Sequence, residues 1–351
     1  MEQSTIQQNN TMPKPDIVAR EFTRPEIETI LTSLISDHDW ELERFVYVFG
    51  GLSTTTIRVD LKGRNSMILK IFYPNPAPVK VFQNAVNIIT FLRDVLPVPF
   101  PLFSSEIQQI QISQNETFPC ILMHYFPGSV AADRAIESGH ADKFSVLAEV
   151  GKVLARMHSI PIPSGQFTSY EEGGAVELGH HMSGKFRKPV LAKKTADFSQ
   201  LYLAELEHSP DMSSMHLGII HGDPFLDNML LDRESFELKG IVDFEDACVG
   251  PTLFDLGSAI AGSCFTETGH MQFELDFIAV ESFLRGYASI RTISIAELES
   301  LTRMIRLALM CNCTFRFLMH ASDAYMDLFV KWKYMREQDS HIRDKLSKTV
   351  D

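Results

Sequence analysis

The sequence has few of the features that mark secreted, membrane-spanning or nucleic-acid-binding proteins. Its cysteines are odd in number and widely scattered, which is typical of free thiols in a reducing compartment rather than of a disulfide framework. No apolar run approaches the ~18 residues of a membrane span. With a net charge of -13, the chain also lacks the basic surface that nucleic-acid binding requires. The five cysteines are Cys120, Cys248, Cys264, Cys311 and Cys313.

The N-terminal residues are mostly polar and contain no apolar core of signal-peptide length. We therefore expect residues 1–22 to form a flexible arm and the protein to be cytoplasmic, with no nucleic-acid or membrane partner. Cys311 and Cys313, with His320, are an alternative metal cluster. A C-x-C pair on a helical pattern, without a second pair, favours buried helix cysteines instead.

Length and pattern together predict two lobes. The chain has 351 residues, 45% of them hydrophobic, which is enough for two cores. Up to residue 124, runs such as "TTIRVDL" and "SMILKIF" predict an antiparallel sheet with one helix, in "VKVFQNAVNIITFLRDVL". Later amphipathic patterns predict helices. The expected fold class is α+β, with a β-rich N-lobe at residues 23–124, a mainly helical C-lobe at residues 125–338 and a tail at residues 339–351.

A polar stretch inside the second lobe is the strongest candidate for chemistry. In "IIHGDPFLDNMLLD" it lies between two apolar runs, so we expect a loop held by a strand at each end. A second apolar run, in "GIVDFEDACVGP", ends at Asp243. Strand ends that present Asp223, Asn228 and Asp243 would bring two carboxylates and a carboxamide together, a set of hard oxygen ligands suited to Mg²⁺.

The spacing of these residues matches the requirements of phosphoryl transfer. One carboxylate must orient the attacking hydroxyl, and oxygen ligands must hold the metal that bridges the phosphates. The kinase pattern H-R-D-x-x-x-x-N is matched by His221-Gly222-Asp223 with Asn228, and D-F-G by Asp243-Phe244-Glu245. The two motifs in this order predict an enzyme that uses ATP and Mg²⁺.

The stretch "HGDPFLDN" followed by "IVDFEDA" resembles the aminoglycoside phosphotransferase and choline kinase superfamily, over most of residues 45–320. The resemblance implies a bilobal protein-kinase-like fold, with Asp223 as the catalytic base and Asn228 and Asp243 as Mg²⁺ ligands. His221 would brace the loop by bonding backbone rather than react. Asp255, in "PTLFDLGSAI", resembles a family aspartate that supports the catalytic loop from the start of a helix.

The N-lobe is expected to bind the nucleotide. In "VFGGLSTTTIRV", Gly50 and Gly51 form a turn that lets backbone amides approach phosphates, and Ser53 and Thr54 add hydroxyl donors, although a plain hairpin is the alternative. Lys70, in "MILKIF", occupies the strand position of the kinase lysine that contacts the α- and β-phosphates. The stretch "CILMHYFPG" resembles the hinge that bonds adenine. Its candidate residues are Met123, His124, Tyr125 and Phe126.

One kinase feature is missing. Kinases hold the strand lysine with a glutamate on the next helix, yet between Lys70 and Pro97 the one acid is Asp94, at the far end of the helix. A neutral hydrogen bond is the expected substitute, and it would hold the lysine less firmly than an ion pair. The candidates for this bond are Gln83, Asn84 and Asn87.

The resemblance implies an acceptor that is a small molecule with a hydroxyl group. The stretches "FGGLSTTTIRV", "LPVPFP" and "ESFLRGYASIRTISIAELESL" resemble type II homoserine kinases, and hydroxylysine kinases share much of this pattern. Glu245 and Asp246 are candidates to face the acceptor amine, with a hydrogen-bonded loop pair as the alternative. An aminoglycoside or choline-type kinase, a hydrolase that activates water, and a catalytically weak nucleotide-binding protein are the other functions to distinguish.

Overall fold

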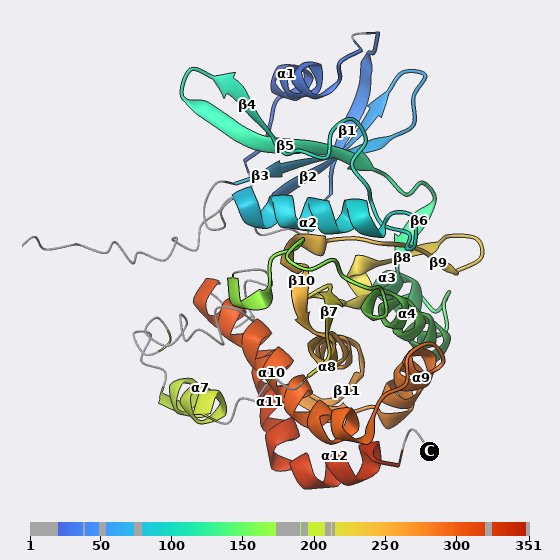
Figure 1. Ribbon diagram of the computed structural model, residues 1–351, viewed down its shortest axis with the longest axis vertical. Coiled ribbons are helices and arrows are strands. Elements are labelled where there is room, and N and C mark those ends of the chain that lie inside the picture. The colour runs from blue at the N-terminus through green and yellow to red at the C-terminus, as the bar shows by residue number, and fades with distance from the viewer. Residues whose placement is uncertain are drawn as a thin grey trace, which may run out of the picture.

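The structure, a computed structural model, has two lobes, one above the other (Figure 1). It describes residues 20–37, 39–48, 54–73, 79–172, 190, 196–207, 212, 215–319 and 325–348. The predicted α+β class and bilobal arrangement are confirmed: an antiparallel sheet dominates the N-lobe and helices dominate the C-lobe. In the described part of the chain, no helix is both long and apolar enough to cross a membrane.

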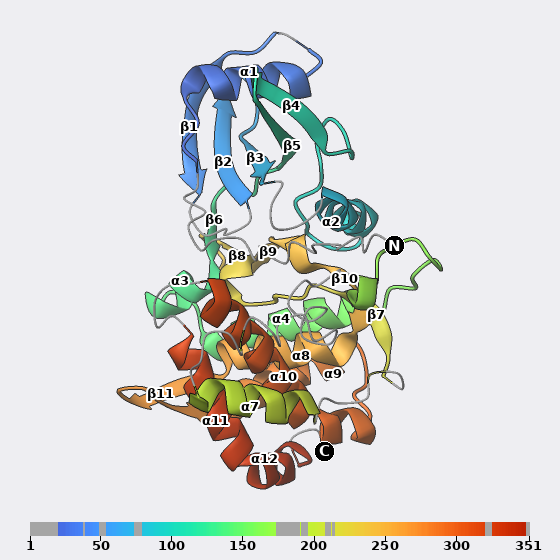
Figure 2. The same ribbon diagram turned by 90° about the vertical axis from the view of Figure 1, so that its left-hand side faces the viewer.

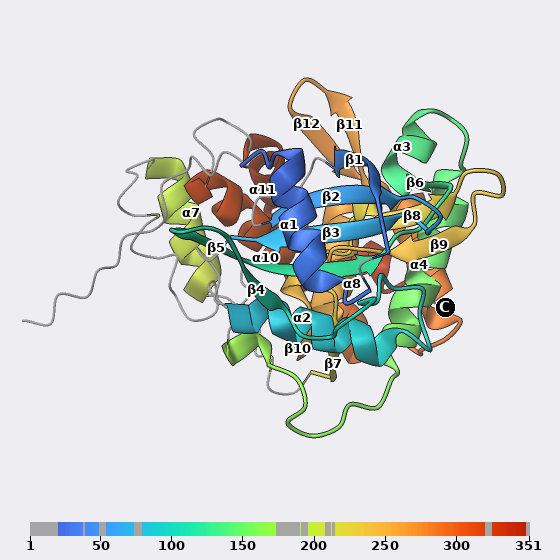
Figure 3. The same cartoon turned by 90° about the horizontal axis from the view of Figure 1, so that it is seen from above.

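The N-lobe is built on a five-stranded antiparallel sheet of order β1-β2-β3-β5-β4. Along β2, Ile57, Val59 and Leu61 are buried at every second position, as a strand with one face on a core requires. Helix α1 lies across one face of this sheet (Figure 3), and α2 lies between the other face and the C-lobe (Figure 1). The elements are α1 (Arg24–Leu34), β1 (Leu42–Val48), β2 (Thr54–Leu61), β3 (Met67–Phe72), α2 (Val79–Leu92), β4 (Gln108–Ser113) and β5 (Glu116–His124).

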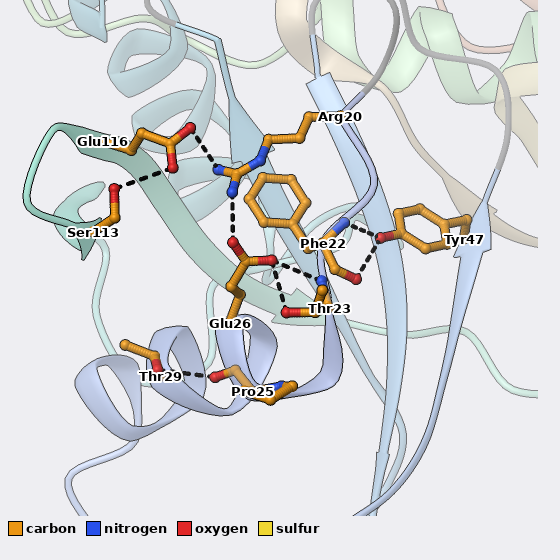
Figure 4. A network of polar contacts seen from close by, with 9 residues as sticks. All are labelled: Arg20, Phe22, Thr23, Pro25, Glu26, Thr29, Tyr47, Ser113 and Glu116. Atoms are coloured by element: carbon orange, nitrogen blue, oxygen red, sulfur yellow. Dashed lines mark hydrogen bonds and ion pairs between the residues drawn. The ribbon is translucent and has the colours of Figure 1, made fainter.

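Helix α1 is a second helix in a region for which we predicted one. Its start carries a recognisable signal: Pro25 stands in the first turn, and the Glu26 carboxylate accepts from the Thr23 backbone amide at 2.8 Å (Figure 4). Arg20 joins this network through Glu26, and Phe22 is buried beside it. Of the arm predicted for residues 1–22, residues 20–22 therefore pack on the lobe, and residues 1–19 lie outside the described residues.

The C-lobe consists of helices around small sheets, β10-β7, β11-β12 and the three-stranded β6-β8-β9, seen from the side in Figure 2. Helix α12 falls within the predicted tail, yet Ile342 and Leu346 on it are fully buried. The elements are β6 (Ser129–Ala131), α3 (Ala132–Glu137), α4 (Lys143–His158), η1 (Tyr170–Glu172), α7 (Ala196–Glu207), β7 (Leu217–Ile220), η2 (Leu226–Asn228), β8 (Met229–Asp232), β9 (Leu238–Ile241), η3 (Phe244–Asp246), β10 (Cys248–Pro251), α8 (Thr252–Ser263), β11 (Phe265–Gly269), β12 (Gln272–Leu275), α9 (Phe277–Ala288), α10 (Ile295–Met319), α11 (Met326–Glu337) and α12 (Asp339–Leu346).

All five cysteines are free and buried, and burial raises the pKa of the Cys120 thiol to about 12. Cys311 and Cys313 lie within α10, as buried helix cysteines, while His320 is outside the described residues. Among the residues that the structure describes, no group of three or more histidine, cysteine, aspartate or glutamate side chains has a metal-binding arrangement. The cysteines therefore serve the core.

Candidate active site

Strands fix both ends of the polar loop predicted from the sequence. Ile220 ends β7 and Met229 begins β8, and neither side chain is exposed to solvent. The Val242 amide donates to the Asn228 carbonyl at 2.9 Å, so the residue before Asp243 is hydrogen-bonded to the end of the loop. This pairing brings the loop and Asp243 together, as the strand-end argument predicted.

Asp223 and Asn228 face each other within the loop. The Asn228 side-chain amide donates to the Asp223 backbone carbonyl at 2.9 Å and to its carboxylate at 3.2 Å. Burial, followed by the negative charges of Asp246, Asp243 and Asp227, raises the pKa of Asp223 well above its ordinary value. The side-chain nitrogen of Asn228 thus donates both hydrogen bonds within the loop. Its side-chain oxygen is the atom that could bind a metal ion.

Asp243 lies two residues after β9, directly before η3, and has left-handed backbone angles, φ 67° and ψ 56°. This conformation is uncommon for a residue other than glycine, and such strain is often kept at functional sites. Its carboxylate is 41% exposed and accepts from Lys70 Nζ at 3.1 Å. Burial favours the protonated form, but the Lys70 ammonium outweighs it, so the pKa of Asp243 is lowered and the group is an anion.

His221 braces the loop, as the backbone-bonding interpretation predicted. It is fully buried, and its Nε2 donates to the Val242 carbonyl at 2.9 Å. Because a carbonyl only accepts, the proton sits on Nε2, and Nδ1 is left to accept from the Asp223 amide at 3.3 Å. Burial lowers the pKa of His221, which keeps the ring neutral.

Asp255, near the start of α8, holds the loop through hydrogen bonds to its backbone. Its two fully buried carboxylate oxygens accept from the backbone amides of His221, at 2.7 Å, and Gly222, at 2.9 Å. His158 Nε2 donates to the same carboxylate at 3.0 Å, so the charge is fully hydrogen-bonded. Gly222 has φ 87°, and a Cβ there would lie 2.7 Å from the Cβ of Asp246. Only glycine therefore fits, and Asp246 lies directly against the loop.

Lys70 reaches the C-lobe instead of helix α2. Its Nζ donates to Glu245 Oε1 at 2.8 Å as well as to Asp243. The expectation that Gln83, Asn84 or Asn87 holds this lysine is wrong. Gln83 bonds Asn87 and the backbone of the segment before β4. Asn84 bridges the Ala247 carbonyl and the Thr168 amide.

The predicted hinge connects the lobes, and several of its backbone groups are already paired. The Met123 backbone is in register with Ile68 of β3, and the His124 amide donates to the Phe100 carbonyl at 2.9 Å. The Arg58 guanidinium lies 4.8 Å from the centre of the Tyr125 ring. The Phe126 carbonyl accepts from the hydroxyl of Ser129. The glycine-turn candidates Gly50, Gly51 and Ser53 lie outside the described residues.

A small cavity of about 20 Å³ lies beside Lys70. Its walls come from α2, β3, β5 and η3, and all its α2 residues are apolar. A hollow of about 340 Å³ is lined in part by His158, His216 and Arg291. Among its lining residues, His158 also bonds Asp255, which holds the loop.

Thr54 and Arg316 are two further residues near the site, and the sequence pointed only to Thr54, as a hydroxyl donor beside the glycine turn. Thr54, on β2, donates its hydroxyl to Glu245 Oε1 at 2.9 Å. Arg316, near the end of α10, is the cation whose charge lowers the pKa of Asp223 against the surrounding carboxylates. No local motif marks Arg316, because it approaches the site only through the packing of distant elements.

Comparison with known proteins defines the class to which this fold and site belong. Residues 47–293 match the model of the phosphotransferase enzyme family, and the chain belongs to that family. A homoserine kinase of Methylobacillus flagellatus is 29% identical over 46% of this chain and 48% of its own length. The chain thus spans about half the length of that curated relative.

Solved structures share the fold at low sequence identity. The choline kinase of Cryptosporidium parvum has a TM-score of 0.64 and 11% identity, covering 92% of this chain and 97% of that one. Amicoumacin kinase, solved in complex with AMP-PNP, Ca²⁺ and Ami, has a TM-score of 0.61 and 15% identity, covering 92% of this chain and 94% of that one. Both are named as kinases, and at these identities the likeness concerns the fold.

Proposed function

We propose that this protein is a kinase that transfers the γ-phosphate of ATP to a hydroxyl of a small amine-bearing molecule, with a homoserine-like amino alcohol favoured. The observation that carries the proposal is the meeting of Asp223, Asn228 and Asp243 at the end of two strand pairs, with Lys70 bonded to Asp243 at 3.1 Å. Family membership supports the same reaction.

In this proposal Asp223 is the catalytic base. Asp223 follows Gly222, against which Asp246 packs, and its raised pKa brings it closer to the range in which a carboxylate accepts a proton efficiently. Asp223 would orient the acceptor hydroxyl and take its proton as the oxygen attacks phosphorus. His221 and Asp255 would hold the loop in place without touching the reacting atoms.

The donor set fits Mg²⁺. Asn228 offers its carboxamide oxygen, and Asp243 offers a carboxylate that is 41% exposed. Proteins commonly bind this ion through one or two carboxylates, with phosphate oxygens and water completing six ligands. When bound, the ion would neutralise charge on the β- and γ-phosphates. The Lys70 ammonium would contact the α- and β-phosphates, and the hinge of Met123, His124, Tyr125 and Phe126 would bond the adenine.

The charges around Asp223 favour an acceptor with an ammonium group. Asp246 and Asp227 both add negative charge there, and Asp246 touches Gly222 of the loop. Arg316 adds one positive charge, and it has no hydrogen bond or ion pair within the part of the chain that the structure describes. An α-amino acid with a hydroxyl carries both complementary charges, as homoserine does. This supports homoserine over choline, which has no carboxylate, and agrees with the names of the curated relatives.

The change Asp223→Asn tests the proposal because it keeps the shape of the side chain and removes the base. We expect turnover to fall about a hundredfold to ten-thousandfold, the usual contribution of a general base, with ATP affinity little changed. ADP release on homoserine would measure turnover, and calorimetry with ATP and Mg²⁺ would measure affinity. Asp344→Asn, an exposed aspartate far from the loop, is the matched control.

The acceptor panel should contain homoserine, hydroxylysine, choline, an amino alcohol without a carboxylate, and an aminoglycoside. A kinase releases ADP only in proportion to the acceptor, whereas a hydrolase releases it without one. Unchanged turnover in the Asp223→Asn variant would contradict the role of Asp223. ATP binding without ADP release on any acceptor would favour the catalytically weak nucleotide-binding protein.

A further inference from the structure

The missing helix acid leaves Lys70 with a physical problem. Its side chain is only 15% exposed, and a buried ammonium is costly unless an opposite charge accompanies it. Helix α2 lines the cavity beside Lys70 with Phe82, Ala85, Val86 and Ile89, none of which can bond an ammonium. The counter-charge must come from another element.

Glu245 provides that charge. Its Oε1 lies 2.8 Å from Lys70 Nζ, and its side chain is 16% exposed, which matches the burial of the lysine. The Thr54 hydroxyl donates to the same Oε1 at 2.9 Å. One carboxylate oxygen of the C-lobe therefore receives donors from two neighbouring N-lobe strands, β2 and β3, which fixes the direction in which the ammonium points.

Asp243 cannot fill this role alone. Its carboxylate is 41% exposed, and in the proposed function it binds the metal. An ammonium that relied on Asp243 would compete with the ion for the same oxygens. With Glu245 as its main partner, Lys70 stays neutralised and directed while Asp243 binds metal.

The two acids after Asp243 thus have different surroundings. Glu245 contacts the N-lobe donors Lys70 and Thr54, on the nucleotide side. Asp246 lies against Gly222 of the loop, and its charge raises the pKa of Asp223, the residue that would face the acceptor in the proposed function. The sequence suggested a common role for the pair, and the geometry separates them.

We infer that Glu245 is the positioning residue for Lys70, taking the place of the acid that kinases carry on the helix after this strand. Glu245 acts on the nucleotide only through the lysine. The inference rests on the proposed function, because the ligand that Lys70 would contact is a nucleotide phosphate. It also means that the phosphate-binding lysine is directed correctly only when the two lobes are in contact.

A double-mutant cycle tests this. ATP affinity is measured by calorimetry in EDTA, without metal, for the wild type, Glu245→Gln, Lys70→Met and the double variant. By charge alone, loss of Glu245 beside the phosphates would tighten binding. We expect it instead to weaken binding about 10- to 100-fold, by analogy with the loss seen when residues that orient metal ligands are removed. In the Lys70→Met background the same change should have no effect on ATP affinity, because the effects of substitutions at coupled residues do not add.

Kinetics separate the competing roles. We expect Glu245→Gln to raise the KM for ATP and leave the KM for the acceptor unchanged, and Glu237→Gln, an exposed glutamate before β9, to change neither. Equal ATP affinity in Glu245→Gln and wild type, an equal loss in both backgrounds, or a rise in the acceptor KM alone would overturn the inference. If Glu245→Gln does not fold, Thr54→Val takes its place in the cycle. A wild type that binds no ATP would overturn the proposed function itself.

Discussion

Single buried side chains determine whether the catalytic loop keeps its shape, and Asp255 is the clearest case. Its carboxylate accepts from two loop amides and from His158 with no exposure to solvent. In Asp255→Asn an amide group would face one of these donors and leave it unpaired, which costs about 1–3 kcal/mol. Urea unfolding should show a loss of that size, together with lower turnover. A variant as stable as the wild type would contradict the bracing role.

A second residue-scale prediction concerns pH. Asp276 caps α9 through the Ala279 amide and accepts from Lys143 of α4 at 3.0 Å. Burial raises its pKa, but the Ala279 amide and the Lys143 ammonium together lower it below the ordinary 3.8. A carboxylate with a lowered pKa stabilises the fold above its unfolded pKa, and this contribution is lost as pH falls through the folded value. Asp276→Asn should therefore be less stable than wild type at pH 7. Urea unfolding at a series of pH values should show the stability difference between the two proteins shrinking as pH falls past 3.8. It should vanish once the folded carboxyl is protonated.

At the scale of elements, the C-lobe depends on the close approach of α4 and α9. A Cβ on Gly151 would lie 2.2 Å from the Phe283 carbonyl oxygen, and one on Gly286 would lie 2.0 Å from the Ala148 oxygen. These backbones touch, so neither helix can move aside without disturbing His158 at the end of α4, which holds Asp255.

The change Gly151→Ala tests this packing. Alanine favours a helix by about 1 kcal/mol over glycine, but overpacking a close contact typically costs about 1–3 kcal/mol. We expect the clash to prevail, because the obstructing atoms are backbone, and the urea midpoint to fall. Arg156→Ala, on the exposed side of the same helix, is the control and should change little. A more stable Gly151→Ala protein would show that the helices can separate freely.

At the scale of the whole molecule, hydrogen bonds between side chains of one lobe and groups of the other join the two lobes. Asn84 of α2 bonds Ala247 and Thr168 of the C-lobe, and Lys70 and Thr54 bond Glu245. A nucleotide bound between the lobes should therefore stabilise the entire fold. ATP at about a hundred times its dissociation constant would add about 2.7 kcal/mol.

Thermal unfolding with ATP, with and without Mg²⁺, measures this stabilisation. In the wild type the ion should add to the effect of ATP, because in the proposed function Asp243 would hold the ion that accompanies the phosphates. In Asp243→Ala the addition should disappear while ATP alone still raises the melting temperature. An Asp243→Ala protein that kept the full effect of Mg²⁺ would contradict the metal assignment.

The sequence by itself determined the parts of this protein that depend on short spacing. Asp223 and Asn228 lie five positions apart, and the apolar runs on either side fix the loop, so their meeting was predictable from a local pattern. The same holds for the antiparallel N-lobe sheet and for His221 as a brace. Helix α1 was missed although Thr23, Pro25 and Glu26 carry its start signal.

Only the tertiary structure decided which charge accompanies Lys70. Glu245 is 175 positions away along the chain, and nothing near either residue indicates the other. The partner was expected on α2 because that helix is adjacent in sequence, but the residues of α2 that line the cavity are apolar. A buried ammonium binds whichever carboxylate the fold brings within about 3 Å, and that depends on how the two lobes pack, which no local pattern specifies.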